Sequence, residues 1–406
     1  MFDVDKGLTG QSGIAAIPGI EPFKNMLSYE VGRRIATAVA RALPGFDRKG
    51  FLRGLEPALA PLELKDRMLC LADRLEAGLP QKPAAAFQAL TGALAKDDSD
   101  LAGLRGFAVW PLGEVVSRRG LEDFSAAMKA IREITIRFTS EFAIRRFLRE
   151  RPDETLSQLA RWVADPNEHV RRLVSEGSRP LLPWGGNLPE IMANPQLTLP
   201  LLERLHGDPS EYVRRSVANH LNDFSKQHPK LVVETLARWK SEKHPGFDQL
   251  AHRAARTLVK KGDPAALALF GFRASRSLQV DRFLLAPDSL AVGDALTYSF
   301  RIRNAGRTRA AVLFDYAVHH QKKDGRLTPK VFKGRKLELA PGSAAEVQGR
   351  HVMRQVTTRT YHPGQHAFEI LINGQSSGKL PFELTAGPRA ARETGRPRSG
   401  RAGRQK

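Results

Sequence analysis

Residues 162–177, WVADPNEHVRRLVSEG, and 205–220, LHGDPSEYVRRSVANH, are two copies of one pattern that lie 43 residues apart. A period of about 40 residues is the length of a helix–turn–helix unit of the HEAT and armadillo kind, in which each unit buries its apolar stripe only by stacking on its neighbours. The repeat therefore predicts an all-α, HEAT-like helical solenoid. A degenerate third copy runs from His244-Pro245 into FDQLAHRAARTLVKKG, and residues 20–160 also have a helical pattern.

Each clear copy contains the dipeptide Asp-Pro, as Asp165-Pro166 and Asp208-Pro209. Aspartate is a favoured N-cap, and proline is favoured in the first turn because it lacks an N–H where none is needed. We therefore expect the second helix of each copy to begin at this dipeptide, with Glu168 or Glu211 in its first turn. Asp263-Pro264 is expected to cap a further helix.

The pattern changes at about residue 273, where apolar and polar residues begin to alternate between turns rich in Gly, Pro and Asp. The alternating segments are SLQVDRFLL, ALTYSFRIRN, AAVLFDYAVHH, KVFKGRKLEL, AEVQGRHVMRQ and HAFEILING. This is typical of an immunoglobulin-like β-sandwich, here without the cysteine pair of an antibody domain. The predicted organisation is a flexible N-terminus at 1–20, a repeat domain at 21–272, a sandwich at 273–386 and a disordered basic tail at 387–406.

The net charge of +21 is uneven, and over two thirds of the excess lies after residue 272. This favours a polyanionic partner, most simply nucleic acid, because phosphates attract Lys and Arg through counterion release. The alternative is a basic protein kept soluble by its charge. Candidate phosphate contacts in the sandwich, with a solvated surface as the alternative, are Arg303, Arg307 and Arg309. Those in the repeats, where an Arg-Arg pair can also face solvent or bind an acid between repeats, are Arg171, Arg172, Arg179, Arg214, Arg215 and Lys226.

Several classes of protein are disfavoured by composition. The single cysteine, Cys70, excludes an internal disulfide and indicates a reducing compartment. No run of 18 apolar residues and no signal-peptide pattern occurs, so we expect no membrane span and a cytoplasmic location. The eleven histidines are scattered, without a helical His-x-x-x-His pair, so we predict neither a metal site nor another cofactor.

Glu141 lies on an apolar stripe if residues 132–150 form one helix. The stripe consists of Ile131, Ile134, Phe138 and Phe142. A carboxylate in such a position costs several kcal/mol of desolvation unless it is paired or faces a cleft. The expected partners are Arg137 and Arg145, each four residues away. The alternative to a functional acid is a structural ion pair between repeats.

Glu176 and Asp223 lie near the C-terminal ends of repeat helices, where the helix dipole disfavours an anion. Aligning the copies on Val170 and Val213 puts Glu176 opposite Asn219, and Asp223 follows one helical turn later. Adjacent repeats therefore direct carboxylates at one shared surface. The alternative is a pair of exposed acids without a function.

Trp184 lies in the Pro/Gly-rich loop RPLLPWGG, soon after Glu176. A rigid aromatic ring at this place could pack against a deoxyribose of DNA. Packing against the next repeat is the alternative.

Four segments resemble the AlkC branch of the HEAT-like-repeat alkylpurine DNA glycosylases. They are EPFKNMLS near the start, FTSEFAIRRFL at 138–148, VRRLVSEGSRPLLPWGGNLP at 170–189 and VRRSVANHLNDFSKQHP at 213–229. The resemblance covers residues 20–270, and one subgroup of that family carries a following immunoglobulin-like domain. It implies removal of cationic bases such as 3-methyladenine and 3-methylcytosine from a bent duplex, without drawing the base into a deep pocket.

The resemblance also places the acidic active-site residues of the family on Glu141, Glu176 and Asp223. An alkylated base is already a cationic leaving group, so carboxylates need only stabilise the sugar cation and position water. We therefore expect a monofunctional DNA glycosylase that acts without a cofactor, as a monomer, on double-stranded DNA containing alkylated bases. The alternative is a catalytically inactive repeat scaffold that binds DNA or a protein partner.

Overall fold

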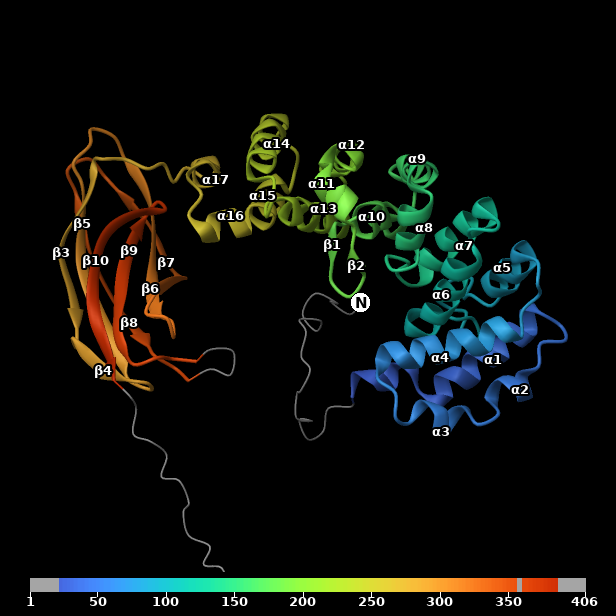
Figure 1. Ribbon diagram of the computed structural model, residues 1–406. Coiled ribbons are helices and arrows are strands. Elements are labelled where there is room, and N and C mark those ends of the chain that lie inside the picture. Colours follow the sequence, from blue (N-terminus) through green and yellow to red (C-terminus); the bar gives the residue numbers. More distant parts are fainter. Residues whose placement is uncertain (1–21, 356–359, 386–406) are drawn as a thin grey trace, which may run out of the picture. The chain divides into compact units, whose positions relative to one another are not determined.

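The computed structural model describes residues 22–355 and 360–385, and it divides the chain between Arg256 and Thr257 into two compact units (Figure 1). Apart from two short strands, β1 Leu181–Leu182 and β2 Gly186–Asn187, the helices come first in the chain and the strands follow, as predicted. The expectations of a flexible segment 1–20 and a disordered tail 387–406 lie outside the described residues.

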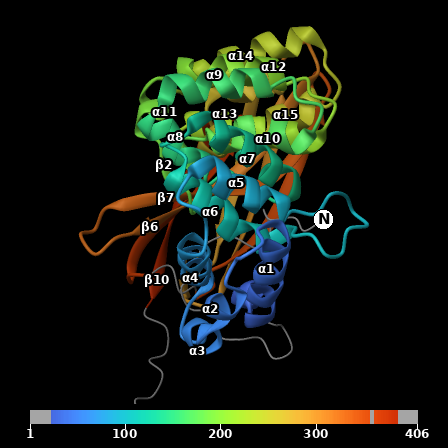
Figure 2. The same cartoon turned by 90° about the vertical axis from the view of Figure 1, so that its right-hand side faces the viewer.

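The first unit consists of helices joined by short connections, and Figure 2 shows its N-terminal helices from the side. Its early helices are η2 Phe23–Leu27, α1 Tyr29–Ala42, α2 Arg48–Leu52, α3 Leu55–Leu59, α4 Leu64–Ala77, α5 Pro83–Gly92, η3 Gly106–Val109, α6 Trp110–Arg119 and α7 Phe124–Arg137. Its later helices are α8 Ile144–Glu150, α9 Pro152–Trp162, α10 Glu168–Gly177, α11 Pro189–Ala193, η4 Pro195–Leu197, α12 Leu199–Leu205, α13 Glu211–Phe224, α14 Pro229–Glu242 and α15 Phe247–Ala254. Helix α16 Arg256–Lys261 crosses the division, and α17 Pro264–Leu269 belongs to the second unit.

The two sequence copies form equivalent layers. Helices α9, α12 and α14 lie along one side, and α10, α13 and α15 along the other (Figure 1). Helix α10 packs against α13, and α13 packs against α15. The alignment positions Val170 and Val213 are both fully buried, so the shared pattern supplies a continuous apolar contact between copies.

The helices of the two copies begin two residues later than the N-cap prediction required. Asn167 and Ser210 are the N-caps of α10 and α13. Asp165 and Asp208 instead start the turn before the helix, because each accepts a hydrogen bond from the backbone N–H two residues later, at 2.9 Å and 2.8 Å. The third prediction of this kind is confirmed, since Asp263 caps α17 by accepting from the Ala266 N–H at 2.9 Å.

The two turn aspartates also join consecutive layers. Arg132 on α7 donates to Asp165 at 2.7 Å, and Arg171 on α10 donates to Asp208 at 2.7 Å. Both pairs are bidentate, and the aspartate side chains are 7% and 4% exposed. In the third copy His244 stands where the aspartate would be. Arg214, the counterpart of Arg171, donates to the backbone carbonyls of Asp208 and Pro209, and no carboxylate within the described ranges pairs with it.

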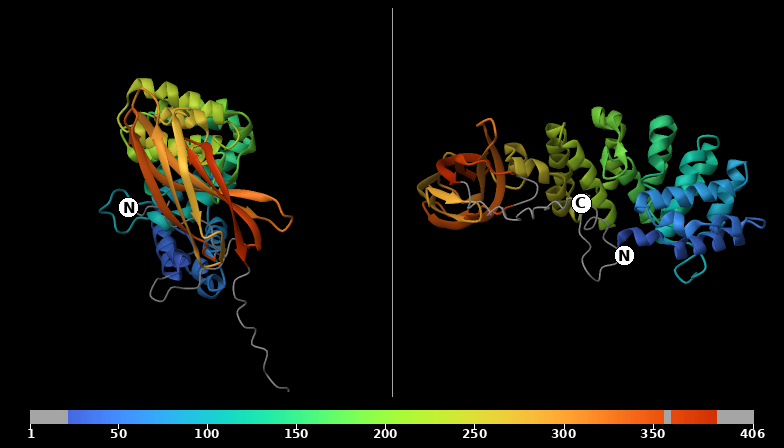
Figure 3. Two further views of the ribbon diagram at one scale, coloured as in Figure 1. Left: turned by 90° about the vertical axis from the view of Figure 1, so that its left-hand side faces the viewer. Right: turned by 60° about the horizontal axis from the view of Figure 1, so that its bottom comes forward.

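The second unit contains two β-sheets packed face to face (Figure 3). The strands are β3 Leu278–Ala286, β4 Ser289–Ala291, β5 Ala295–Asn304, β6 Ala310–Gln321, β7 Leu327–Leu339, β8 Ala344–Val352, β9 Gly364–Ile372 and β10 Gln375–Thr385. One sheet has the order β4-β10-β9-β6-β7 and the other β3-β5-β8. Fully buried rings from both sheets, such as Phe300 and Phe314 at 4.9 Å between centroids, fill the space between them.

The six alternating sequence segments all form strands, but the pattern missed β4 and β10. Strand β10 pairs with β9 along most of its length and buries Phe382 and Leu384. Its first half, QSSGK, has no apolar alternation, and the register shifts between Ser376 and Gly378.

The second unit begins before the predicted boundary at 272/273. Helix α17 and the segment after it pack with the β9–β10 turn, where the Asn373 side-chain amide donates to the Arg273 carbonyl at 2.8 Å. Gly374 has φ +76°, and a Cβ at this position would lie 2.4 Å from the Gly262 carbonyl oxygen. The backbones therefore meet too closely for a side chain here.

Among the residues described, no helix has the length and apolarity needed to cross a membrane.

The layer-joining pairs predict a difference between two equivalent arginines. Arg171→Leu leaves the Asp208 carboxylate buried without its cation, which costs about 3–5 kcal/mol. Arg214→Leu removes no carboxylate partner and should cost clearly less. Urea unfolding followed by helical circular dichroism measures both losses, and equal losses would contradict a stabilising role for the Arg171–Asp208 pair.

Candidate nucleic-acid and catalytic site

Glu141 lies in a turn and not on a helix, which corrects the prediction of one helix over 132–150. Helix α7 ends at Arg137 and α8 begins at Ile144. Thr139 explains part of the break, because its hydroxyl donates to Glu141 Oε2 at 2.7 Å and accepts from the Glu141 N–H at 3.2 Å. Such local bonds compete with the helical ladder. Glu141 is nevertheless buried, with 7% of its surface exposed.

The predicted partners of Glu141 are also wrong. Arg137 pairs with Glu133 at 3.0 Å, and Arg145 donates to backbone carbonyls only. The cation that binds Glu141 is Arg172 of α10, which comes from the next layer of the stack. Helical spacing alone could not find it, because the two residues are 31 apart in sequence.

Glu176 occupies the last turn of α10 and is 4% exposed. Its Oε1 accepts from Arg179 Nη1 at 2.6 Å, and its Oε2 accepts from the Ser216 hydroxyl of α13 at 2.6 Å. Arg172 Nη2 lies 3.6 Å from the same carboxylate. Three donors from two layers therefore surround this acid.

Asp223 lies near the end of α13 and is 3% exposed. Arg179 approaches it side on, with Nε 3.0 Å from Oδ2 and Nη2 3.3 Å from Oδ1. One guanidinium thus joins Glu176 and Asp223, as the shared surface predicted from the repeat alignment requires.

These five residues form a continuous series of alternating charge: Glu141, Arg172, Glu176, Arg179 and Asp223. We call it the carboxylate–arginine chain. Three carboxylates face two guanidiniums, so the chain has one excess negative charge. A buried cluster of this kind is costly to desolvate and remains only where each charge is paired.

The two carboxylates that share Arg179 differ in acidity. Burial opposes ionisation of Glu176, but the charges of Arg172 and Arg179 outweigh it and lower the pKa to about 2. Burial dominates at Asp223 and raises its pKa above the usual value, although Arg179 counteracts this. The environment therefore makes Asp223 the more basic of the pair.

Arg145 holds the loop that follows α10. It is 1% exposed and donates to four carbonyls, those of Gly177, Arg179, Gly185 and Gly186. Burial lowers its pKa to about 10, which leaves the guanidinium charged at neutral pH. No sequence spacing identified this residue as a loop clamp, because its acceptors are backbone atoms.

The clamped loop presents Trp184. The ring lies between the short strands β1 Leu181–Leu182 and β2 Gly186–Asn187, and it is 47% exposed. Its backbone has φ +64°, a conformation that is uncommon for a residue with a large side chain. The exposure disfavours the alternative in which Trp184 packs into the next repeat.

The candidate phosphate contacts divide into two groups. Arg171, Arg172 and Arg179 are bound to carboxylates, and Arg179 is only 6% exposed, so the structure does not leave it free to contact a phosphate. Arg215 lies 3.6 Å from Glu211, and Arg309 lies 3.4 Å from Glu338. Among the described residues, four candidates form no ion pair with a carboxylate: Lys226, Arg303 and Arg307, which are exposed, and Arg214, which is half-buried and donates to backbone carbonyls. DNA binding by the whole set stays a prediction.

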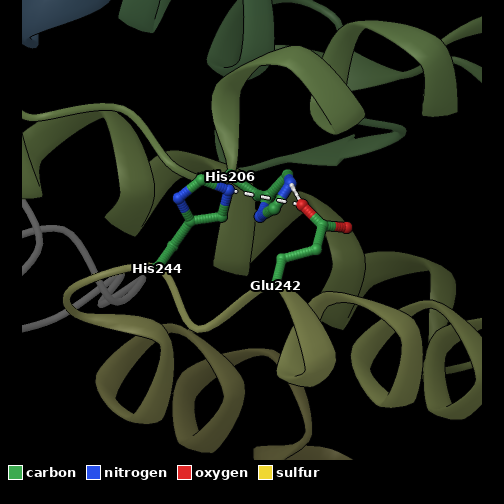
Figure 4. A group of neighbouring side chains, drawn as sticks. All are labelled: His206, Glu242 and His244. Carbon is green, nitrogen blue, oxygen red and sulfur yellow. Dashed lines mark ion pairs between the residues drawn. The ribbon is translucent and has the colours of Figure 1, made fainter.

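The histidines are less scattered in space than in sequence. His206, Glu242 and His244 bring nitrogen and oxygen atoms within 4.8 Å of one another (Figure 4). These three residues, at the C-terminal ends of α12 and α14 and in the loop after α14, could hold a metal ion, and the spacing of the histidines in the sequence did not indicate this group.

Comparison with known proteins agrees with this architecture. Residues 118–259 match the family model described as DNA alkylation repair enzyme, and residues 279–386 match that of the YhaZ C-terminal Ig-like domain. The chain belongs to the family of DNA alkylation repair enzymes.

Two relatives cover nearly the whole chain. An uncharacterised protein of Bacillus subtilis, YhaZ, is 34% identical over 89% of this chain and 99% of its own length. The solved structure of the alkylpurine DNA glycosylase AlkC of Pseudomonas fluorescens, bound to DNA containing an abasic site analogue, is also 34% identical. It covers 90% of this chain and 100% of its own, with a TM-score of 0.77. The resemblance deduced from the motifs is thus confirmed, as is the immunoglobulin-like class of the second unit.

The acidity of Glu176 predicts how stability depends on pH. Its pKa is lower in the folded protein, about 2, than the usual 4.5, so its contribution is present above pH 4.5 and is lost as the pH falls toward 2. Glu176→Gln should flatten the loss of stability over this range, measured by denaturant unfolding at successive pH values.

Asp223 supplies a control of opposite sign. Its folded pKa is raised, so its contribution is present at low pH and is lost as the pH rises through that pKa. Asp223→Asn should therefore steepen the loss of stability on acidification. Parallel curves for the parent and both variants would show that the two carboxylates do not differ as described.

Proposed function

We propose that the protein is a monofunctional DNA glycosylase that hydrolyses the N-glycosidic bond of cationic alkylated bases, such as 3-methyladenine and 3-methylcytosine, in duplex DNA. One observation carries the proposal. Three acids that are far apart in sequence converge on the carboxylate–arginine chain, beside a clamped loop that presents a half-exposed tryptophan. The 34% identity to a DNA glycosylase over 90% of the chain supports it.

Hydrolysis of the N-glycosidic bond of a cationic base needs an anionic environment more than it needs a proton donor. When the bond between C1′ and the base nitrogen breaks, both electrons leave with the base and neutralise its positive charge, so no proton donor is required. Positive charge develops on the sugar, and a water molecule adds to C1′ and loses a proton. Fixed carboxylates favour both events, as they do for oxocarbenium-like transition states in glycoside hydrolysis.

The different environments of the acids support different roles within this proposal. Asp223, whose pKa burial raises, is the better acceptor for the proton of water. Glu176 stays ionised at all physiological pH values and stabilises the sugar cation electrostatically. Glu141 positions Arg172, which in turn lies against Glu176. This division follows the rule that neighbouring carboxylates with separated pKa values perform separate tasks.

The DNA partner is engaged by a monomer, with the phosphate backbone contacting cations that form no ion pair within the described part of the chain. Arg214 and Lys226 serve this purpose in the helical unit, and Lys226 is close enough to Asp223 to influence its ionisation. Trp184 packs against a deoxyribose from its exposed loop. The HEAT-like solenoid class and cleavage without a deep base pocket belong to the same proposal.

A catalytically silent scaffold is the second candidate, and one observation favours it. Every acid of the carboxylate–arginine chain is ion-paired, which would stabilise stacked repeats whether or not chemistry occurs. A scaffold for DNA, however, gains nothing from carboxylates close to phosphates. Replacing them should leave its DNA binding unchanged or improved.

Release of base from methylated duplex DNA distinguishes the two candidates. We expect the parent protein to release 3-methyladenine or 3-methylcytosine, detected by chromatography and mass spectrometry. Glu176→Gln and Asp223→Asn should each slow release about 100-fold or more, in line with the loss of one preorganised electrostatic group. DNA affinity should survive in both variants, because cations and not these acids provide the attraction to phosphate.

The matched control is Glu234→Gln, an exposed acid on α14 that lies 3.8 Å from Lys230. It should release base at the parental rate. Tight DNA binding by the parent without any base release would support the scaffold and not the enzyme.

The immunoglobulin-like unit contributes phosphate contacts in the same proposal. Arg303 and Arg307 are exposed near the turn between β5 and β6. Arg303→Gln and Arg307→Gln in the full-length protein should each reduce the slope of log affinity against log salt by about one. Point substitutions are preferable to deleting residues 273–406, since α17 packs on this unit. An unchanged slope would exclude these two side chains from the interface.

A further inference from the structure

We propose that His206, Glu242 and His244 form a binding site for a divalent transition-metal cation of the zinc type. The site is separate from the carboxylate–arginine chain, and it does not depend on the glycosylase proposal. Figure 4 shows both imidazole rings directed at the same carboxylate.

The distances are close to those of a metal site. His206 Nε2 lies 3.2 Å and His244 Nε2 lies 3.3 Å from Glu242 Oε2, and the three ligand atoms are within 4.8 Å of one another. Tetrahedral zinc with bonds of about 2.1 Å separates its ligands by about 3.4 Å. Two of the three edges already have this length. A small rotation of His244, whose side chain is 42% exposed, closes the third.

The surroundings hold the ligands in place. The His206 ring is buried at the C-terminal cap of α12 and stacks on Trp239, with centroids 4.2 Å apart and planes at 6°. The Trp239 indole N–H donates to Glu203 at 2.6 Å, which fixes the ring beneath. Lys243 has φ +55°, so the chain turns sharply between Glu242 and His244 and brings both to one side. A left-handed residue commonly ends a helix, so this turn is set by the C-terminal end of α14.

The donor set selects the kind of cation. Two imidazole nitrogens and one carboxylate oxygen are the ligands of many zinc sites that keep a fourth position for water. Imidazole favours zinc, cobalt, nickel and copper, whereas magnesium and calcium prefer oxygen ligands alone. A second explanation for the cluster is a pair of His–Glu ion pairs with protonated rings, and this would show no metal binding.

The place of the site in the stack indicates its purpose. His244 occupies the position at which Asp208 of the preceding copy pairs with Arg171. A cation bound to His206 of α12, Glu242 of α14 and the following loop would therefore join layers where the Arg–Asp pair is missing. The same loop contacts Arg214, since a Cβ on Gly246 would lie 2.8 Å from Arg214 Nε. The metal would stabilise the stack and position this arginine.

Cobalt titration of the metal-free, full-length protein tests the proposal, in a Cys70→Ser background that removes the single thiol. We expect one equivalent of Co²⁺ to produce the visible absorption bands of a tetrahedral ion, Zn²⁺ to displace it, and Zn²⁺ to raise the melting temperature. His244→Gln should weaken binding at least about tenfold, because it removes one of three ligands. His244 is the first choice, since replacing His206 also removes the stacking on Trp239.

His252→Gln is the matched control, because His252 is an exposed histidine on the nearby helix α15. It should bind Co²⁺ like the parent. Binding that is absent in the parent, or equally strong in His244→Gln, overturns the proposal. A stability that depends on pH but not on metal would assign the cluster to ion pairing.

Discussion

Arginine bound to a buried carboxylate of a neighbouring layer is the interaction on which the helical unit depends. It occurs at both ends of the repeat helices. Arg132 and Arg171 bind the aspartates of the turns that precede α10 and α13, and Arg172 and Arg179 bind the acids of the carboxylate–arginine chain, two of which lie near the C-terminal ends of α10 and α13. Arg171 and Arg172 are adjacent in sequence but serve different layers, since one binds Asp208 ahead and the other Glu141 behind. The pair Arg171-Arg172 thereby connects its own layer to the layers before and after it.

The same interaction also forms the candidate active site. Apolar side chains would stack the helices at lower desolvation cost, so a series of five charges, four of them buried, calls for another reason. The two guanidiniums lower the pKa of Glu176 and oppose the effect of burial at Asp223, and in a buried environment the fields of charged groups are stronger than in water. Because the arginines come from the stack itself, the charge pattern forms as soon as the layers assemble. The scaffold and the candidate active site are thus one set of contacts.

Much of the fold, and part of the candidate site, was predictable because these features depend on local periodicity in the sequence. The repeat identified the helical copies, the alternating segments identified six strands, and helix-end positions identified Glu176 and Asp223. The sequence missed features that depend on contacts between distant residues. The apolar stripe gave no sign that Thr139 would form a local hydrogen bond with Glu141 and so help to end the helix. Arg172 binds Glu141 in place of arginines nearer in the sequence because the stacking of the layers brings the two residues together. Strand β10 forms because it pairs with β9. The rings of His206 and His244 are in contact although α13 and α14 separate these residues in the sequence.

The bridge made by Arg179 has a mechanical consequence. Glu176 belongs to α10 and Asp223 to α13, so the two contacts of the planar Arg179 guanidinium depend on the spacing between two successive layers. Any change in the curvature of the stack between α10 and α13 must lengthen one of the contacts of Arg179 or move the two acids together with Arg179. A ligand that alters the bend of the stack would then also alter the separation of the two carboxylates. The distance between the Glu176 and Asp223 carboxylates would then depend on the shape of the ligand that binds to the stack.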